Sequence, residues 1–187
     1  IGTQNAALSV GGGNGSLTAC TFEYDGSSWS AGGDLQVARY NMAGGGTQDA
    51  AIVAGGGFYN QCCICTEEYN GTSWSNGGSL SQARYELAGA GTQNATLASG
   101  GVTNTQTNCT EEYDGTSWST ATGFSTTRRS IGGNGTQNAA LIFGGNANSN
   151  NSCTEEYNGS TWSTSGALQV GRCCSAGAGL QSAALAI

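Results

Sequence analysis

The chain contains no histidine, no lysine and no proline, and only 9% of its 187 residues are charged. Without histidine it lacks the commonest general base, the residue on which serine and cysteine triads depend, and a preferred ligand of catalytic zinc and copper. These absences weigh against an enzyme, so we expect no catalytic residues, no metal and no cofactor. No apolar run approaches the roughly 20 residues that a membrane-spanning helix needs, which predicts no membrane insertion.

All basic residues are arginines, and the five of them stand against 12 acidic residues, so the formal net charge is −7. A negative surface repels phosphate backbones, and nucleic acid is therefore not an expected partner. The 33 glycines would suit a low-complexity chain, but they recur at regular positions beside short apolar runs such as residues 50–54. We therefore expect an ordered all-β protein.

One stretch, CTEEYNGTSWS at residues 65–75, returns with small changes at residues 20–30, 109–119 and 153–163. Its tyrosines lie 45, 44 and 44 residues apart, and a period that regular indicates a structural repeat. Threonine, tyrosine and tryptophan favour strands, and the Asn-Gly or Asp-Gly between them is typical of a two-residue type I′ turn. Each copy is therefore predicted to be a β-hairpin.

A second repeated segment, Gly-Thr-Gln-Asn or Gly-Thr-Gln-Asp followed by an apolar run and a glycine pair, starts at residues 2, 46, 91 and 135, with a partial copy at residue 179. Each apolar run has four to six residues, which fits a strand buried on both faces and is too short for an independent helix. A further strand is expected to open at the repeated arginine and to close at the Gly-Thr-Gln turn. One repeat thus has four short strands in about 44 residues.

Four-stranded units of this length, none of which buries its faces alone, are the sequence signature of β-propeller blades. Their ordered features resemble the kelch repeat family over almost the whole chain: an arginine opens strand one, a glycine pair ends strand two, and strands three and four carry the tyrosine and the tryptophan. The Tyr-to-Trp spacing of five residues is tighter than in many kelch repeats. The resemblance implies one kelch-like propeller domain over residues 1–187, with repeat units at about 1–38, 39–83, 84–127 and 128–171 and a closing segment at 172–187.

The count of strands predicts how the ring closes. The apolar strand occurs five times and each of the others four times, so the end of the chain is expected to supply a strand by overlap with the beginning. We expect four blades in preference to five. The surplus strand at residues 181–187 leaves open a ring with a spare edge, a longer array, or pairing with a neighbouring subunit.

The connections between the second and third strands are expected to lie together at one end of the propeller. They share no pattern, and variable loops on a repeated scaffold are where such folds place recognition. Their amides and two aromatic side chains suit sugars or polar protein surfaces, although the loops could equally be solvated connectors. The candidate binding residues are Phe58, Tyr59, Asn60, Asn104, Gln106, Asn148 and Asn150.

The eight cysteines fall toward the same end, and a high, even count fits an oxidising, extracellular setting. We expect most of them to form disulfides, with one within residues 62–65 and one that involves residue 173 or 174. Buried thiols and a cysteine-only zinc site are the alternatives. The four repeat-equivalent cysteines are expected to lie too far apart to pair with one another, because a bridge needs Cα atoms within roughly 7 Å. The disulfide candidates are Cys20, Cys62, Cys63, Cys65, Cys109, Cys153, Cys173 and Cys174.

The glutamate before each repeated tyrosine matches the repeated arginine one for one, which predicts structural salt bridges. Paired carboxylates would also suit a glycosidase, but a copy in every repeat indicates architecture, since a glycosidase needs one unique pair. The predicted ion-pair residues are Glu23, Glu68, Glu112, Glu156, Arg39, Arg84, Arg128 and Arg172.

The sequence of the repeats, GTQNAAL followed by EYDGTSW, also resembles repeat arrays in fibre or appendage proteins of marine phages. This resemblance implies an extracellular or virion-surface location, with copies of the chain or other structural subunits as partners. We expect a non-enzymatic structural or adhesive component that recognises a host surface or partner through its variable loops. The alternatives are a free-standing carbohydrate-binding propeller lectin, with surface glycans as partners, and a hydrolase.

Overall fold

The protein is described by a computed structural model that covers residues 1–13, 16–58 and 61–187. The described residues form β-strands and no helix, which confirms the predicted all-β class. Within these residues, nothing has the length and apolar character of a membrane-spanning helix. Four antiparallel sheets have four strands each, and two smaller sheets have two strands each.

Each four-stranded sheet contains one copy of the repeat. The first sheet consists of β1 (Gly2–Thr3), β2 (Ala6–Val10), β3 (Thr21–Tyr24) and β4 (Trp29–Ala31). The second consists of β5 (Ala43–Gly46), β6 (Ala51–Ala54), β9 (Thr66–Tyr69) and β10 (Trp74–Asn76). The third consists of β11 (Ala88–Thr92), β12 (Ala95–Ser99), β13 (Thr110–Tyr113) and β14 (Trp118–Ala121). The fourth consists of β15 (Gly132–Thr136), β16 (Ala139–Phe143), β17 (Thr154–Tyr157) and β18 (Trp162–Ser165). The two-stranded sheets are β7 (Gly57–Phe58) with β8 (Gln61–Cys62), and β19 (Gly177–Leu180) with β20 (Ala183–Ala186).

The repeated hairpins are present, but their turns are longer than predicted. Tyr69 of β9 pairs with Trp74 of β10, and their ring centroids lie 4.9 Å apart. Four residues therefore connect the two strands, and the prediction of a two-residue type I′ turn is wrong. The Oδ1 atom of Asn70 accepts the backbone N–H groups of Thr72 and Ser73 at 3.0 and 2.9 Å. A side chain thus closes the turn that the backbone alone was expected to close.

The apolar runs form interior strands of the sheets, as predicted. β6, β12 and β16 are buried along most of their length and pair with a strand on each side. The strand before each run is shorter than expected. In the second copy, Asn41 has a φ of 55°, which ends the extended segment at Arg39 and Tyr40 before β5 begins. Tyr40 instead makes an isolated bridge to Gly57.

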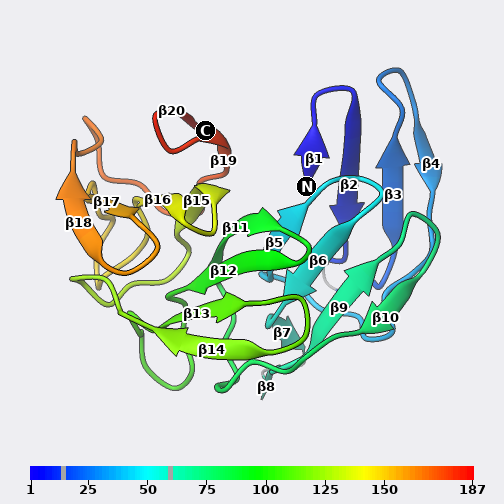
Figure 1. The fold of residues 1–187 in the computed structure, drawn as a ribbon, viewed down its shortest axis with the longest axis horizontal. Coiled ribbons are helices and arrows are strands. Elements are labelled where there is room, and N and C mark those ends of the chain that lie inside the picture. The colour runs from blue at the N-terminus through cyan, green and yellow to red at the C-terminus, as the bar shows by residue number, and fades with distance from the viewer. Residues whose placement is uncertain (14–15, 59–60) are drawn as a thin grey trace.

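The sheets follow one another in chain order, and Figure 1 shows β4, β10, β14 and β18 at the periphery of the molecule. The inner strands β5, β11, β15 and β19 are neighbours in that order. The closing segment differs from the expected overlap. Among the described residues β19 and β20 pair only with each other, while the first sheet takes all of its strands from residues 2–31.

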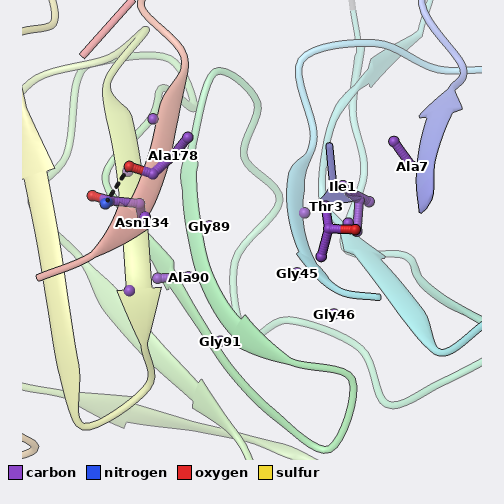
Figure 2. Close-up of a pocket in the computed structure, with 16 residues that line it drawn as sticks. Ile1, Thr3, Ala7, Gly45, Gly46, Gly89, Ala90, Gly91, Asn134 and Ala178 are labelled. Atoms are coloured by element: carbon purple, nitrogen blue, oxygen red, sulfur yellow. Dashed lines mark hydrogen bonds between the residues drawn. The ribbon is translucent and has the colours of Figure 1, made fainter. Parts of the chain in front are cut away.

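A cavity of about 350 Å³ lies between the inner strands, and Figure 2 shows its lining. Most of the lining is backbone, because the inner strands consist largely of glycine and alanine. A Cβ atom at Gly89 would lie 2.4 Å from the carbonyl oxygen of Gly44, so these glycines allow β5 and β11 to approach closely. Asn134 donates from Nδ2 to the carbonyl of Ala178 at 3.2 Å and thereby connects β15 to β19.

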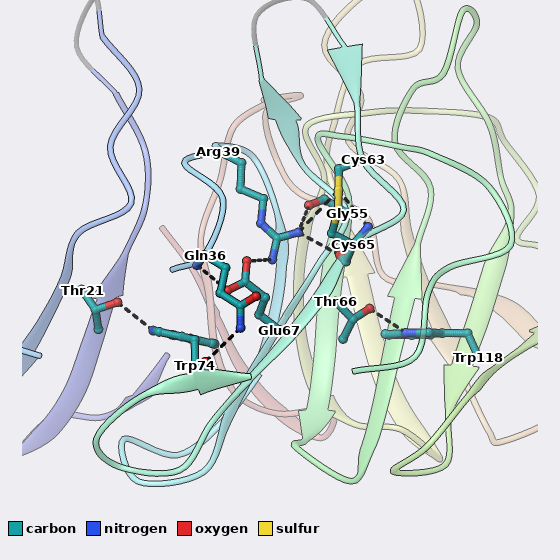
Figure 3. Close-up of polar contacts among 10 residues, drawn as sticks. All are labelled: Thr21, Gln36, Arg39, Gly55, Cys63, Cys65, Thr66, Glu67, Trp74 and Trp118. Atoms are coloured by element: carbon teal, nitrogen blue, oxygen red, sulfur yellow. Dashed lines mark hydrogen bonds and ion pairs between the residues drawn. A yellow bond between two sulfur atoms is a disulfide. The ribbon is translucent and has the colours of Figure 1, made fainter. Parts of the chain in front are cut away.

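Side-chain hydrogen bonds join each copy to the one before it, and two of these contacts appear in Figure 3. The indole N–H of a tryptophan donates to the threonine that opens the third strand of the preceding copy. The bonds run from Trp74 to Thr21 at 2.9 Å, from Trp118 to Thr66 at 2.9 Å, and from Trp162 to Thr110 at 3.1 Å. Each tryptophan therefore fixes its sheet against the preceding one.

The repeated tyrosines and glutamines make the same kind of contact. Each tyrosine hydroxyl donates to a glutamate of the preceding copy, from Tyr69 to Glu23, from Tyr113 to Glu68, and from Tyr157 to Glu112. Gln93 Nε2 donates to the carbonyls of Ala51 at 3.0 Å and Tyr69 at 2.7 Å, and Gln48, Gln137 and Gln181 repeat this pattern. Burial and the bond to Glu68 raise the pKa of Tyr113 to about 12, so its hydroxyl remains a donor at neutral pH.

The first copy differs from the others. Within the described residues, the Tyr24 hydroxyl and the Trp29 indole N–H have no glutamate or threonine of a preceding copy to bind. Trp29 is 53% exposed, whereas Trp74 is 5% exposed. Tyr24 and Trp29 still stack on each other at 5.0 Å. The hairpin therefore forms in each copy, but burial of its aromatic pair requires the neighbouring sheet.

Replacing Tyr113 with phenylalanine tests the contact between copies. The change removes a partly buried hydrogen bond to the Glu68 carboxyl group, and we expect the free energy of unfolding in urea to fall by about 1.5–3 kcal/mol. Tyr24→Phe is the matched control, because the Tyr24 hydroxyl has no hydrogen-bond partner among the described residues. Its effect is expected to stay within about 0.5 kcal/mol. Equal losses in the two variants would contradict a stabilising bond between copies.

Candidate functional site

The second, third and fourth copies each contain an arginine with no exposed surface. Arg39 Nη1 donates to the carbonyls of Gly55 at 2.9 Å and Cys65 at 2.8 Å, and its Nη2 pairs with Glu67 Oε1 at 2.9 Å, as Figure 3 shows. The other oxygen of Glu67 accepts the backbone N–H of Gln36 at 2.7 Å. Burial lowers the pKa of Arg39, and the carboxylate opposes that shift. This cluster fastens the end of β6, the start of β9 and the connection from the preceding sheet.

The acidic partner of each arginine is the residue before the one predicted. The pairs are Arg39 with Glu67 at 2.9 Å, Arg84 with Glu111 at 2.7 Å, and Arg128 with Glu155 at 3.2 Å. The predicted partners Glu23, Glu68 and Glu112 instead accept the tyrosine hydroxyls of the next copy, and Glu156 accepts Ser165 Oγ at 2.6 Å. Successive strand residues point to opposite faces of a sheet, so adjacent glutamates cannot share one partner. Arg172 is exposed and has no acidic partner among the described residues.

The variable loops contain a cavity of about 520 Å³ that is lined by residues from two neighbouring copies. In each of these copies the loop folds back on itself, through bridges from Val102 to Gln106 and from Asn146 to Asn150. Gln106 Nε2 lies 3.5 Å from Asn146 Oδ1, so the loops also approach each other. Because the lining residues come from two different copies, the cavity exists only when the third and fourth sheets pack together.

Three of the predicted binding residues line this cavity, namely Asn104, Gln106 and Asn148. Asn150 does not line it and belongs to the bridge in its own loop. Phe58 belongs to β7, which pairs with β8 in the loop of the second copy. Tyr59 and Asn60 lie outside the described residues. The structure therefore brings together the candidates from the third and fourth copies.

The cavity also contains residues that sequence reasoning missed. Tyr85, Thr127 and Arg129 reach it from the segments that precede β11 and β15. Arg129 Nε lies 3.6 Å from Glu86 Oε2, and the Arg129 side chain is 38% exposed. The signal was present in the sequence, because the fourth copy has Arg-Arg where the second and third have Arg-Tyr. This extra arginine gives the cavity a cation beside its amides and its aromatic ring.

The cysteines form fewer disulfides than expected. Cys63 and Cys65 are joined, within the loop where one bridge was predicted. The Cys174 thiol donates a hydrogen bond to Cys173 Sγ at 3.2 Å, and the two cysteines form no disulfide. The other free thiols are Cys20, Cys62, Cys109 and Cys153. Burial raises the pKa of the Cys109 thiol, which keeps it protonated and unreactive at neutral pH.

The donor and acceptor groups of the loop cavity suit binding by hydrogen bonds. Across residues 1–13, 16–58 and 61–187, no three side chains of the metal-ligating types come together. No protein-family model matches the sequence, and no curated protein is significantly similar to it. The geometry of the chain itself must therefore support any functional proposal.

Arg84→Met tests the buried ion pair. The change leaves Glu111 buried without its cation, and we expect the free energy of unfolding to fall by about 3–5 kcal/mol. Replacing Glu111 with glutamine in the same variant is expected to restore part of that loss. Arg129→Met is the matched control, because an exposed pair contributes at most about 1 kcal/mol. Similar losses from Arg84→Met and Arg129→Met, measured by urea unfolding, would argue against the buried pair as an organising contact.

Proposed function

We propose that the four sheets are blades of a kelch-like β-propeller, and that the chain is a non-enzymatic structural or adhesive component of a virion or extracellular appendage. Three observations support the propeller arrangement. The inner strands are neighbours in chain order, a cavity lies between them, and the same hydrogen bonds join successive sheets. We favour four complete blades, with β19 and β20 as the inner half of a further one.

The contrast between the sheets and their loops carries the functional proposal. All four sheets contain the same stacked aromatic pair, and the second, third and fourth copies also repeat the buried arginine and the contacts to the preceding copy. The loops above them differ in sequence, and the cavity between two of them combines amides, a tyrosine and an arginine. A repeated scaffold that presents one variable, polar end is suited to recognition of a partner surface.

Carbohydrate binding by a free-standing lectin is the second candidate. Tyr85 offers a flat apolar ring, and Asn104, Gln106 and Asn148 offer both donors and acceptors in the same cavity. A sugar presents this combination of an apolar face and a rim of hydroxyl groups. The cavity occurs between the third and fourth copies, so a lectin of this type would use one unique site.

Electron microscopy of native material from the source, with an antibody raised against this chain, tests the structural proposal. We expect the antibody to label a particle or filament at regular positions, because a scaffold component occupies fixed sites in its assembly. As a control, the antibody is first incubated with the purified chain, which should abolish the labelling.

A chain found only as a soluble monomer that binds a defined glycan would contradict the structural proposal and favour the lectin. On a glycan array, that activity should fall at least about tenfold in Asn104→Ala or Asn148→Ala, since each removes polar contacts from the cavity. Asn5→Ala, in an exposed turn at the opposite end of the sheets, should bind as the unchanged chain does.

A further inference from the structure

Arg129 in the loop cavity differs from the three buried arginines. Arg39, Arg84 and Arg128 have no exposed surface, and each faces a glutamate of its own copy. The Arg129 side chain is 38% exposed, and its acidic contact among the described residues runs from Nε to Glu86 Oε2 at 3.6 Å. No described residue accepts a hydrogen bond from its Nη1 or Nη2 atom, whereas Arg39 uses both of these atoms within the protein. The outer edge of the Arg129 guanidinium is therefore open to a ligand.

The acidic neighbour of Arg129 does not line the loop cavity. Glu86 lines a separate cavity of about 300 Å³. Its Oε2 atom accepts the hydroxyl of Ser130 at 2.5 Å, and the same atom faces Arg129 Nε. The described lining of the loop cavity thus contains a guanidinium group and no carboxylate, although the whole chain has a net charge of −7. In a protein of that charge, this cavity attracts an anionic group more strongly than the surrounding surface does.

The polar side chains near Arg129 also have free hydrogen-bonding groups. Asn148 donates its backbone N–H to Asn146 Oδ1 at 3.0 Å. Its side-chain amide, like that of Asn104, has no hydrogen-bond partner among the described residues, and both residues are exposed. Tyr85 adds an aromatic ring to the same cavity, whose volume of about 520 Å³ lies within the range of roughly 300–1,000 Å³ that is typical of small-molecule sites. One ligand can therefore contact a cation, an aromatic ring and two amides together.

We propose that the loop cavity binds an acidic sugar, a uronic acid whose carboxylate pairs with Nη1 and Nη2 of Arg129. The planar fork of a guanidinium matches a carboxylate through two parallel hydrogen bonds. The apolar face of the sugar ring lies on Tyr85, and the sugar hydroxyl groups bond to the amides of Asn104 and Asn148. This inference rests on the proposed recognition through the variable loops, and adds to it the chemical class and the charge of the ligand.

An acidic peptide fits this cavity less well than an acidic sugar does. The backbone of Val102 already bridges to Tyr85 and to Gln106, so it is not available for pairing with a further strand. A bound peptide would therefore lack the main-chain hydrogen bonds from which extended peptides gain affinity. The lining instead offers side-chain amides and hydroxyl groups, which complement the many hydroxyl groups of a sugar.

Calorimetry with matched pairs of ligands tests the proposal. The probes are the trimers of galacturonic, glucuronic and mannuronic acid, each compared with its methyl ester, which keeps the sugar but removes the charge. We expect one of these acids to bind once per chain, with an affinity at least about tenfold higher than that of its ester, because the ester cannot form the charge-assisted pair. Arg129→Gln should weaken binding of the acid by a similar factor and leave the affinity for the ester unchanged. About 1 M sodium chloride should likewise weaken binding of the acid alone.

Arg172→Gln is the matched control for the charge. It removes the same charge from an exposed arginine that does not line the loop cavity, so it should bind the acid as the unchanged chain does. Equal losses in Arg129→Gln and Arg172→Gln would overturn the proposal, because they would reflect only the net charge of the chain. Equal affinity for acid and ester would also overturn it, as would the absence of binding by all three acids at millimolar concentration.

Further outcomes separate this proposal from recognition by the loops in general. If neutral sugars bind as well as acids and Asn104→Ala removes that binding, the assigned charge is wrong and recognition through the loops stands. Tighter binding of a triglutamate peptide than of every sugar would make a peptide the occupant and overturn the proposal. Antibody labelling of a particle or filament does not depend on these titrations, so failure of the structural proposal would be seen separately.

Discussion

The structure depends on hydrogen bonds that the repeated side chains make between successive copies. In each junction a tryptophan, a tyrosine and a glutamine of the later copy donate to the earlier copy. In return, a glutamate of the later copy accepts a backbone N–H of the earlier one. A single four-stranded sheet cannot bury both of its faces, so its aromatic hairpin becomes part of a core only against a neighbour. The exposed Trp29 and the buried Trp74 show the same hairpin with and without that neighbour.

The buried arginine has a different role, since its partners lie within its own copy. Taking a guanidinium and a carboxylate out of water is costly, and the structure offsets this with backbone carbonyls for the cation and a backbone N–H for the anion. The cluster sits where the variable loop leaves one strand and enters the next. It therefore holds the base of each loop in a fixed position while the loop sequence changes above it. This arrangement explains how one scaffold can present different loops.

The sequence alone predicted the repeat, the all-β class and the buried apolar strands, because period and composition encode them directly. It did not predict which glutamate of Glu67-Glu68 faces the arginine, since both residues are charged and the strand turns them to opposite faces. The turn after Tyr69 was predicted too short, because Asn-Gly also suits a longer turn that the asparagine side chain closes. The loop cavity was beyond sequence reasoning for a geometric reason. It forms where Asn104 and Asn148, from different copies, come together.

The indole N–H groups provide the most direct test of the contact between copies. Solvent exchange of these protons in the folded chain can be measured by NMR, with each signal assigned by a Trp→Phe variant. The account predicts slow exchange for Trp74, Trp118 and Trp162, which donate to threonines, and fast exchange for Trp29, which is largely exposed. Fast exchange at all of these positions, or equal protection of Trp29, would contradict it.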